Sequence, residues 1–145
     1  AAREYLERQP VVDPTRLGAI GYCFGGGVVL EMARAGGDLR GVVGFHGSLD
    51  SPAAPKPGAV TAQVLVLTGG ADPFVPKEQV ETFEREMDAA GANYRVISYP
   101  GVKHSFTNPQ ATENGKKFNL PLEYNGAAAK QSWSEALAFF ERVMK

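Results

Sequence analysis

The segment Gly21-Tyr22-Cys23-Phe24-Gly25-Gly26-Gly27 carries the most structural information in this chain. An apolar run, residues 17–22, ends there and a helical pattern begins, which predicts a strand, a tight turn and a helix in direct succession. This G-x-C-x-G sequence is a variant of the nucleophile elbow, in which the turn lifts one side chain out of the fold. The only cysteine of the chain, Cys23, stands at the nucleophile position. The segment therefore predicts a thiol nucleophile.

The residues around Cys23 fit the demands of such a turn. Gly21 and Gly25 would let the strand and the helix pass closely without a side-chain collision. The backbone N–H of Phe24 would lie at the start of the helix and point at the oxygen of a bound acyl group, as one donor of an oxyanion hole. The helix N-terminus would also favour the thiolate. The alternative interpretation of Cys23 is a buried structural thiol in a glycine-rich turn.

Other functions of a glycine-rich turn are excluded by the residues that follow it. A phosphate-binding loop needs Gly-Lys-Ser or Gly-Lys-Thr, and neither follows. A dinucleotide fingerprint that begins with Gly25 and Gly27 needs a third glycine where Leu30 stands. One cysteine, two histidines and no H-E-x-x-H sequence form no pattern of metal ligands, so we expect no metal.

Length and composition limit the class of protein. The 145 residues suit one domain, residues 1–145, and a hydrophobic content of 43% can supply its core. A formal net charge of −1 argues against nucleic acid or an anionic membrane as the main partner. No apolar stretch is long enough to span a bilayer, and no signal peptide opens the chain, which begins with Ala1. Because a single cysteine cannot form an internal disulfide, we expect a cytoplasmic protein.

Apolar runs alternate with helical patterns along the chain. We expect four strands, over residues 17–22, 41–46, 63–68 and 94–99. Strands that alternate with helices favour a mostly parallel sheet that is covered on both faces. The predicted fold class is therefore α/β, with about four mostly parallel strands flanked by helices. A Pro-rich loop is expected over residues 51–57, and a polar, irregular segment over residues 107–125.

Helical periodicity places helices between and after these strands. The end of a helix is expected over residues 3–8. The helix after Cys23 should stop at Gly36-Gly37 and bury an apolar stripe of Val28, Val29, Met32 and Ala33. A helix between Pro76 and Gly91 should bury Val80, Phe83 and Met87. The last helix, residues 127–144, should face inward with Trp133, Ala136, Leu137, Phe140 and Met144.

Two further residues form a candidate catalytic set with Cys23. Asp72 follows the third predicted strand and His104 follows the fourth, and functional residues in such sheets lie beyond the carboxyl ends of the strands. The chain order is then nucleophile, acid and base, in which His104 takes the thiol proton and Asp72 holds the imidazole. Taken singly, Asp72 could instead cap a turn, and His104 could be a surface histidine.

Three more residues are candidates for the pocket. His46 ends the second predicted strand at the same edge of the sheet, so it competes with His104 as the base. We expect His46 instead to line the pocket or to form a local hydrogen bond. Phe74 and Phe106 flank the acid and the histidine and could form an apolar acyl site, with ordinary core packing as the alternative. The segment 116–124 is either a lid or a linker.

Four segments together resemble the dienelactone hydrolase family of α/β-hydrolases. The resemblance runs from about Asp13 to the C-terminus. It implies hydrolysis of esters or lactones through a thioester intermediate, a triad of Cys23, His104 and Asp72, and no cofactor. The four segments are Gly-Tyr-Cys-Phe-Gly-Gly-Gly (21–27), Phe-His-Gly-Ser-Leu (45–49), Gly-Gly-Ala-Asp-Pro-Phe-Val-Pro (69–76) and Lys-His-Ser-Phe-Thr-Asn-Pro (103–109).

The chain departs from this family in two ways. Members are considerably longer, and their N-terminal half carries the first strands, a second oxyanion donor and an acidic residue that pairs with the resting cysteine. Members that act on dienelactone have an arginine four residues after the histidine, where this chain has Asn108. The expected substrate is therefore a small neutral ester rather than dienelactone itself.

Without the N-terminal half, the strand over residues 17–21 would be an apolar, uncharged edge of the sheet. Such an edge invites pairing with another chain. We therefore expect a homodimer or a higher homo-oligomer through this strand, in which the partner could supply the second oxyanion donor. The alternative function is a non-catalytic remnant, or half of a split hydrolase that needs an N-terminal partner chain.

Overall fold

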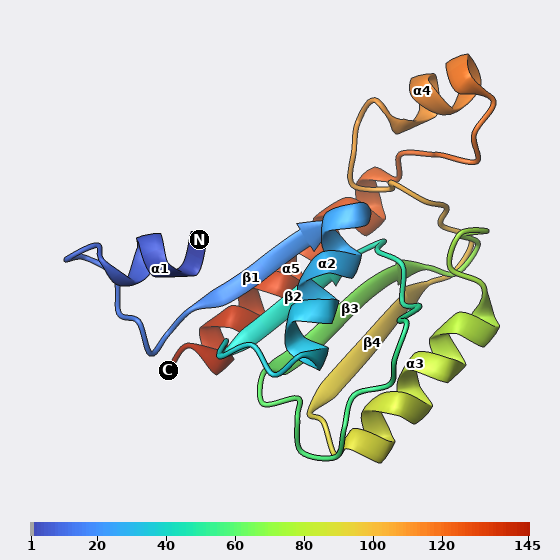
Figure 1. The fold of residues 1–145 in the computed structure, drawn as a ribbon. Coiled ribbons are helices and arrows are strands. Elements are labelled where there is room, and N and C mark those ends of the chain that lie inside the picture. Colours follow the sequence, from blue (N-terminus) through green and yellow to red (C-terminus); the bar gives the residue numbers. More distant parts are fainter. Residues whose placement is uncertain (1) are drawn as a thin grey trace.

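Four parallel strands form the centre of the protein (Figure 1). The computed structural model describes residues 2–145. The strands lie in the order of the chain and are β1 (Gly18–Tyr22), β2 (Gly41–Phe45), β3 (Gln63–Gly69) and β4 (Tyr94–Tyr99). All four predicted strands are confirmed, and their ends differ from the prediction by at most one residue.

Helices cover both faces of this sheet. On one face lie α2 (Phe24–Arg34) and α3 (Lys77–Ala90), and on the other lies α5 (Gly126–Val143) (Figure 1). The short α1 (Ala2–Glu7) lies beyond the start of β1, and α4 (Ala111–Phe118) projects from the end of the sheet where the strands finish. The predicted α/β class with flanking helices is confirmed.

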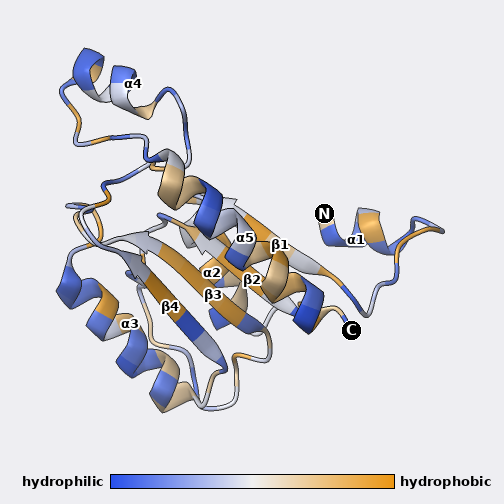
Figure 2. Ribbon diagram, turned by 180° about the vertical axis from the view of Figure 1, so that it is seen from behind, coloured by the Kyte–Doolittle hydropathy of each residue, from blue (hydrophilic) through white to orange (hydrophobic). Residues whose placement is uncertain are grey.

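On each face, the sheet and its helices pack together around a hydrophobic core. In β3, Val64 and Val66 face α2 and α3, whereas Leu65 and Leu67 face α5. This alternation follows from the two-residue period of a strand. Because both faces are covered, β2 and β3 are continuous apolar runs rather than alternating sequences, as is usual for parallel sheets (Figure 2).

The ends of α3 have the residues that the sequence predicted. Pro76 is the N-cap, where a missing N–H costs nothing, and Gly91 ends the helix with a left-handed φ of 67°. Phe83 and Met87 are buried on its inner face, and Val80 is half-buried there. Hydrophilic and hydrophobic segments alternate along this helix in Figure 2.

The inner face of α5 differs from the prediction. Ala136, Phe139 and Val143 are buried, whereas Trp133 and Leu137 are 45% and 48% exposed. The close approach of α5 to β2 explains this orientation, because a Cβ at Gly41 would collide with Phe139 and Val143. Phe140 and Met144 are only partly buried, and they lie against Gly18 of β1.

The apolar stripe predicted for α2 is also only partly buried. Val29, Leu30 and Ala33 lie in the core, whereas Val28 and Met32 are 42% and 40% exposed. Val28 and Met32 are four residues apart, on the side of α2 that faces away from its buried residues. The prediction that these two residues are buried is therefore wrong.

The segment 107–125 is not irregular, because it contains α4. The helix ends at Asn119, which has a left-handed φ of 51°. The chain packs back closely against it, since a Cβ at Gly115 would collide with the carbonyl of Leu122. Within residues 2–145, no helix is long and apolar enough to cross a bilayer.

Candidate active site

The three candidate catalytic residues meet at the carboxyl ends of the strands. Cys23 directly follows β1, Asp72 follows β3 by three residues, and His104 follows β4 by five residues. Because the strands are parallel, these ends lie at one edge of the sheet. The structure brings all three side chains together, although 81 residues separate Cys23 from His104.

The backbone at Cys23 has the geometry of a nucleophile elbow. Cys23 has φ 51° and ψ −120°, a conformation that a residue with a side chain rarely adopts. Its N–H donates to the carbonyl of Phe45 at 3.0 Å, and its side chain is exposed. A Cβ at Gly21 would collide with the backbone of Gly25. A Cβ at Gly25 would meet nothing, so only the first of the two glycines is needed for clearance.

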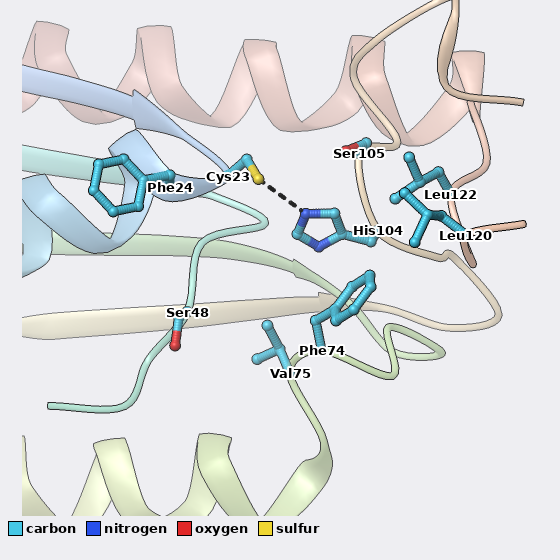
Figure 3. Close-up of a pocket in the computed structure, with 9 residues that line it drawn as sticks. All are labelled: Cys23, Phe24, Ser48, Phe74, Val75, His104, Ser105, Leu120 and Leu122. Atoms are coloured by element: carbon cyan, nitrogen blue, oxygen red, sulfur yellow. Dashed lines mark hydrogen bonds between the residues drawn. The ribbon is translucent and has the colours of Figure 1, made fainter. Parts of the chain in front are cut away.

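Phe24 begins α2 immediately after the cysteine. The N–H of a first helical residue has no carbonyl partner within its helix, so this group is free to bind an anionic oxygen. The ring of Phe24 points away from Cys23 and His104 and is 84% exposed (Figure 3). The contribution of Phe24 to the site is therefore its backbone.

The loops that follow β3 and β4 are hydrogen-bonded to each other, which brings Asp72 to His104. After β3, the N–H groups of Gly70 and Ala71 donate to the carbonyls of Tyr99 and Val102, at 2.7 and 2.9 Å. The loops approach so closely that a Cβ at Gly69 would collide with the carbonyl of Val102. The two loops are thus held together by backbone groups.

Hydrogen bonds connect the three side chains in a row. His104 Nδ1 donates to Asp72 Oδ2 at 2.7 Å, and His104 Nε2 lies 3.2 Å from Cys23 Sγ (Figure 3). The carboxylate of Asp72 is fully buried, and its other oxygen accepts the N–H of Phe74 at 2.9 Å. The carboxylate therefore fixes the imidazole tautomer, with Nε2 directed at the sulfur.

The surroundings of His104 favour its charged form. Burial acts to lower its pKa, but the hydrogen bonds to Asp72 and Cys23 and the charges of both groups outweigh burial. The net result is a pKa above the ordinary value of 6.5. The arrangement can thus accept the thiol proton and hold it as imidazolium beside a thiolate.

A pocket of about 420 Å³ opens beside Cys23 and His104. Phe74 lies in its wall, and its ring meets the ring of His104 edge to face with centroids 5.0 Å apart. No lysine or arginine occurs among the residues that line it. These residues are Cys23, Phe24, Ser48, Phe74, Val75, His104, Ser105, Leu120 and Leu122 (Figure 3).

His46 and Phe106 lie behind His104 rather than in the wall of this pocket. His46 Nε2 shares a hydrogen bond of 2.8 Å with the hydroxyl of Thr107, and its ring is 5.2 Å from the ring of His104. Burial, followed by the charge of His104, lowers the pKa of His46 to about 4. Phe106 is fully buried against His46 and Tyr99. The hydrogen bond of His46 joins it to a residue 61 positions away and is not the local bond that was expected. Neither residue lines the pocket, and Phe106 has the core packing that was its alternative.

The sequence did not reveal five pocket residues, one of which, Val75, directly follows Phe74. Ser48 and Ser105 follow β2 and β4 closely and could have been found from their positions. Leu120 and Leu122 come from the segment after α4, and no local pattern in the sequence points to them. Across residues 2–145, no group of three or more His, Cys, Asp or Glu side chains is placed to hold a metal ion.

Comparison with known proteins gives consistent matches. The model of the dienelactone hydrolase family matches residues 1–144. A protein of Caenorhabditis elegans is 34% identical over 99% of this chain and 90% of its own length. A protein of Escherichia coli K12, named as a candidate carboxymethylenebutenolidase, is 30% identical over 90% of this chain, which spans only 47% of that protein.

A solved structure extends this likeness to three dimensions. A dienelactone hydrolase-like promiscuous phosphotriesterase from metagenomic libraries superposes with a TM-score of 0.91 and is 34% identical. The match covers 100% of this chain and 59% of that one. The chain therefore spans about half to three fifths of these longer relatives, and nine tenths of the nematode protein.

Proposed function

Because the chain belongs to the dienelactone hydrolase family, we propose that it hydrolyses carboxylic esters or lactones with Cys23 as the nucleophile. One observation carries this proposal, namely the row of hydrogen bonds from Asp72 through His104 to the cysteine sulfur. Three side chains from three separate strand ends share this geometry. A structural thiol would need neither the histidine nor the buried carboxylate behind it.

The first half of the proposed reaction transfers the acyl group to sulfur. The proton of Cys23 passes to His104 Nε2, and the thiolate attacks the carbonyl carbon of the ester. The carbonyl oxygen becomes an oxyanion, which the N–H of Phe24 can bind. As the intermediate collapses, the bond to the alcohol oxygen breaks, and the imidazolium gives its proton to that oxygen. An alcohol leaves and a thioester remains on Cys23.

The second half releases the acid. A water molecule attacks the thioester carbon while His104 Nε2 takes one of its protons. The carbon–sulfur bond then breaks, the carboxylic acid leaves, and the proton on the imidazolium returns to the thiolate. Asp72 stabilises the imidazolium in both halves without being protonated itself.

The proposed substrate is an uncharged ester or lactone. A substrate carboxylate in the pocket would have no cation beside it, since neither lysine nor arginine lines the wall. Asn108 is exposed, and its side chain accepts the N–H of Gln110 in a turn. A neutral acyl group among apolar side chains avoids the cost of burying an unpaired charge.

Hydrolysis of p-nitrophenyl acetate by the purified chain tests this function. We expect turnover by the wild type and a loss of about 1,000-fold or more in kcat for Cys23→Ala, because the nucleophile is removed. Thermal unfolding of both chains controls for folding. Equal rates for the two chains would contradict the proposal.

A second candidate function is that of one part of a hydrolase that needs a complementary chain segment. The observation that favours it is a group of exposed apolar side chains on α2, β1 and α5, for which the name apolar strip is used. Exposed strips of this kind resemble a protein core cut in half. The strip comprises Val28 and Met32 of α2, Ile20 and Tyr22 of β1, and Trp133 and Leu137 of α5. If the chain is such a part, it hydrolyses no ester by itself.

We propose that a second copy of the chain covers this strip. The nematode relative is matched over 90% of its length, so a protein of nearly this extent occurs without the remainder of the longer hydrolases. No charged side chain lies in β1, whose residues are Gly-Ala-Ile-Gly-Tyr, so two such edges do not repel each other. In such a pair, the partner copy is a source for a second oxyanion donor.

A further inference from the structure

The segment 107–125 leaves the body of the protein after the histidine loop and returns beside it (Figure 1). On its return, Leu122 pairs with His104 in a parallel β-bridge. The N–H of Glu123 donates to the carbonyl of His104 at 3.2 Å, and the N–H of Asn125 donates to the carbonyl of Phe106 at 3.1 Å. The returning chain is therefore fastened to the backbone that carries the catalytic imidazole.

The returning chain also builds part of the pocket. Leu120 and Leu122 line it beyond His104 as seen from the sulfur, whereas Phe24 lies on the other side of Cys23 (Figure 3). Tight packing of α4 against the carbonyls of Leu120 and Leu122, at Gly115, keeps this wall in place. Leu120 is 46% exposed, so it has free apolar surface to offer a ligand.

His104 gives its proton to the leaving oxygen, and this step determines which part of a substrate lies beside these leucines. The oxygen that leaves must lie at His104 Nε2, because that atom supplies its proton. The oxyanion must lie at the N–H of Phe24, the residue that begins α2 directly after Cys23. An alcohol group attached to the leaving oxygen therefore extends past the imidazole, toward Leu120 and Leu122.

We infer that Leu120 and Leu122, together with Phe74, form the binding site for the alcohol portion of the ester, and that this portion is an apolar alkyl group. The inference rests on the proposed function and adds a direction to it, since it assigns the His104 side of the pocket to the leaving group. All three side chains are apolar and face the same pocket. The acyl portion then lies toward Phe24 and Ser48.

Two series of esters separate the alcohol portion from the acyl portion. The first series is methyl, ethyl, butyl and hexyl acetate, in which only the alcohol grows. For the wild type, we expect kcat/KM to rise about two- to fourfold per added methylene group up to butyl, because a buried methylene contributes roughly 0.8 kcal/mol. The second series is p-nitrophenyl acetate, butyrate and hexanoate, in which only the acyl group grows.

The variants Leu120→Ser and Leu122→Ser test the assignment. Each should flatten the alcohol series, with the hexyl-to-methyl ratio of kcat/KM falling about tenfold, and leave the slope of the acyl series as in the wild type. Phe118→Ser is the matched control, because Phe118 lies in the same segment, is 58% exposed and does not line the pocket. Leu120 is the safer substitution for folding, since nearly half of its surface is already in water.

The outcomes distinguish this inference from the function on which it rests. If the wild type hydrolyses p-nitrophenyl acetate but its alcohol series is flat, the alkyl site is overturned and the hydrolase remains. If the leucine variants change the acyl series instead, the direction of the substrate is reversed and the inference is wrong. If the wild type hydrolyses no ester, the proposed function fails and the inference fails with it.

Discussion

Three non-glycine residues at the site have positive φ angles: Cys23 at 51°, His46 at 38° and Ser105 at 59°. Such conformations cost free energy and persist where the surrounding structure holds them. Each lies just after a strand or next to His104, where the chain must turn sharply to bring side chains together. The strain is therefore concentrated where the candidate chemistry takes place.

His46 predicts a dependence of stability on pH. Its pKa is about 4 in the folded chain and about 6.5 when unfolded, so between these values the unfolded chain takes up a proton that the folded chain does not. The free energy of unfolding should therefore fall as pH falls from 6.5 to 4. From the two pKa values, this loss is about 3 kcal/mol, as an upper bound.

Urea unfolding of the wild type and His46→Asn at several pH values measures this effect. Asparagine tolerates a positive φ and can still bond to Thr107, so the variant removes mainly the titration. The difference in unfolding free energy between the two chains should grow between pH 6.5 and 4 in favour of the variant. A constant difference would show that folding does not lower the pKa of His46, which contradicts the prediction. The raised pKa of His104 acts above pH 6.5, outside this range.

At the scale of residues, the sequence could reveal the candidate catalytic set but not the packing around it. Cys23, Asp72 and His104 each follow a predicted strand, so their meeting follows from the parallel order of the sheet. The positions of His46 and Phe106 depend on how rings pack behind the imidazole, at centroid distances of 5.2 Å. Local sequence carries no signal for such packing, so it could not decide between the pocket position and the core packing that was the alternative for Phe106.

At the scale of elements, the turn between β1 and α2 gives a pair of matched substitutions. Gly21→Ala places a methyl group against the backbone of Gly25, so it should destabilise the chain by about 2 kcal/mol or more. Gly25 lies in α2, and a Cβ added there has no atom within 4 Å. Because alanine has a better helix propensity than glycine, Gly25→Ala should stabilise the chain by up to about 1 kcal/mol.

Urea unfolding of both glycine variants, compared with the wild type, measures these changes. Both substitutions add one methyl group within the same turn. The difference in unfolding free energy between the two variants therefore tests whether the close contact of strand and helix lies at Gly21. Equal losses of stability, or a larger loss for Gly25→Ala, would show that the strand and the helix do not meet as described.

The boundaries of the elements were predictable where strong local signals mark them. Proline and glycine mark the ends of α3, and the apolar runs mark the four strands. The helix α4 lacks such signals, since its sequence Ala-Thr-Glu-Asn-Gly-Lys-Lys-Phe is polar and contains a glycine. It is held by the returning chain at Gly115 and Thr112, which are contacts that a local pattern cannot show.

At the scale of the whole molecule, the sheet ends at β1 with an unpaired strand edge. Periodicity predicted that Trp133, Leu137 and Val28 face the core, whereas all three are exposed. A sequence pattern identifies an apolar face, and the topology of the sheet decides whether that face is buried.

The proposed pairing of two copies predicts a mass of two chains in light scattering at micromolar concentration. Ile20→Lys adds a charge to the open strand, where Ile20 is 40% exposed, and should shift the mass to that of one chain. Phe118→Lys, on the distant α4, is the control and should leave the mass unchanged. A wild type that has the mass of one chain contradicts the pairing.

The proposed hydrolysis depends on acylation of Cys23, which can be measured by mass. The measurement is the mass of the intact chain, quenched with acid during its reaction with p-nitrophenyl acetate, beside Cys23→Ala treated in the same way. Because the chain has one cysteine, a thioester can form at one position only. We expect one added acetyl group on the wild type and none on the variant. Release of p-nitrophenol at equal rates by both chains, with no acetyl group on the wild type, would contradict it.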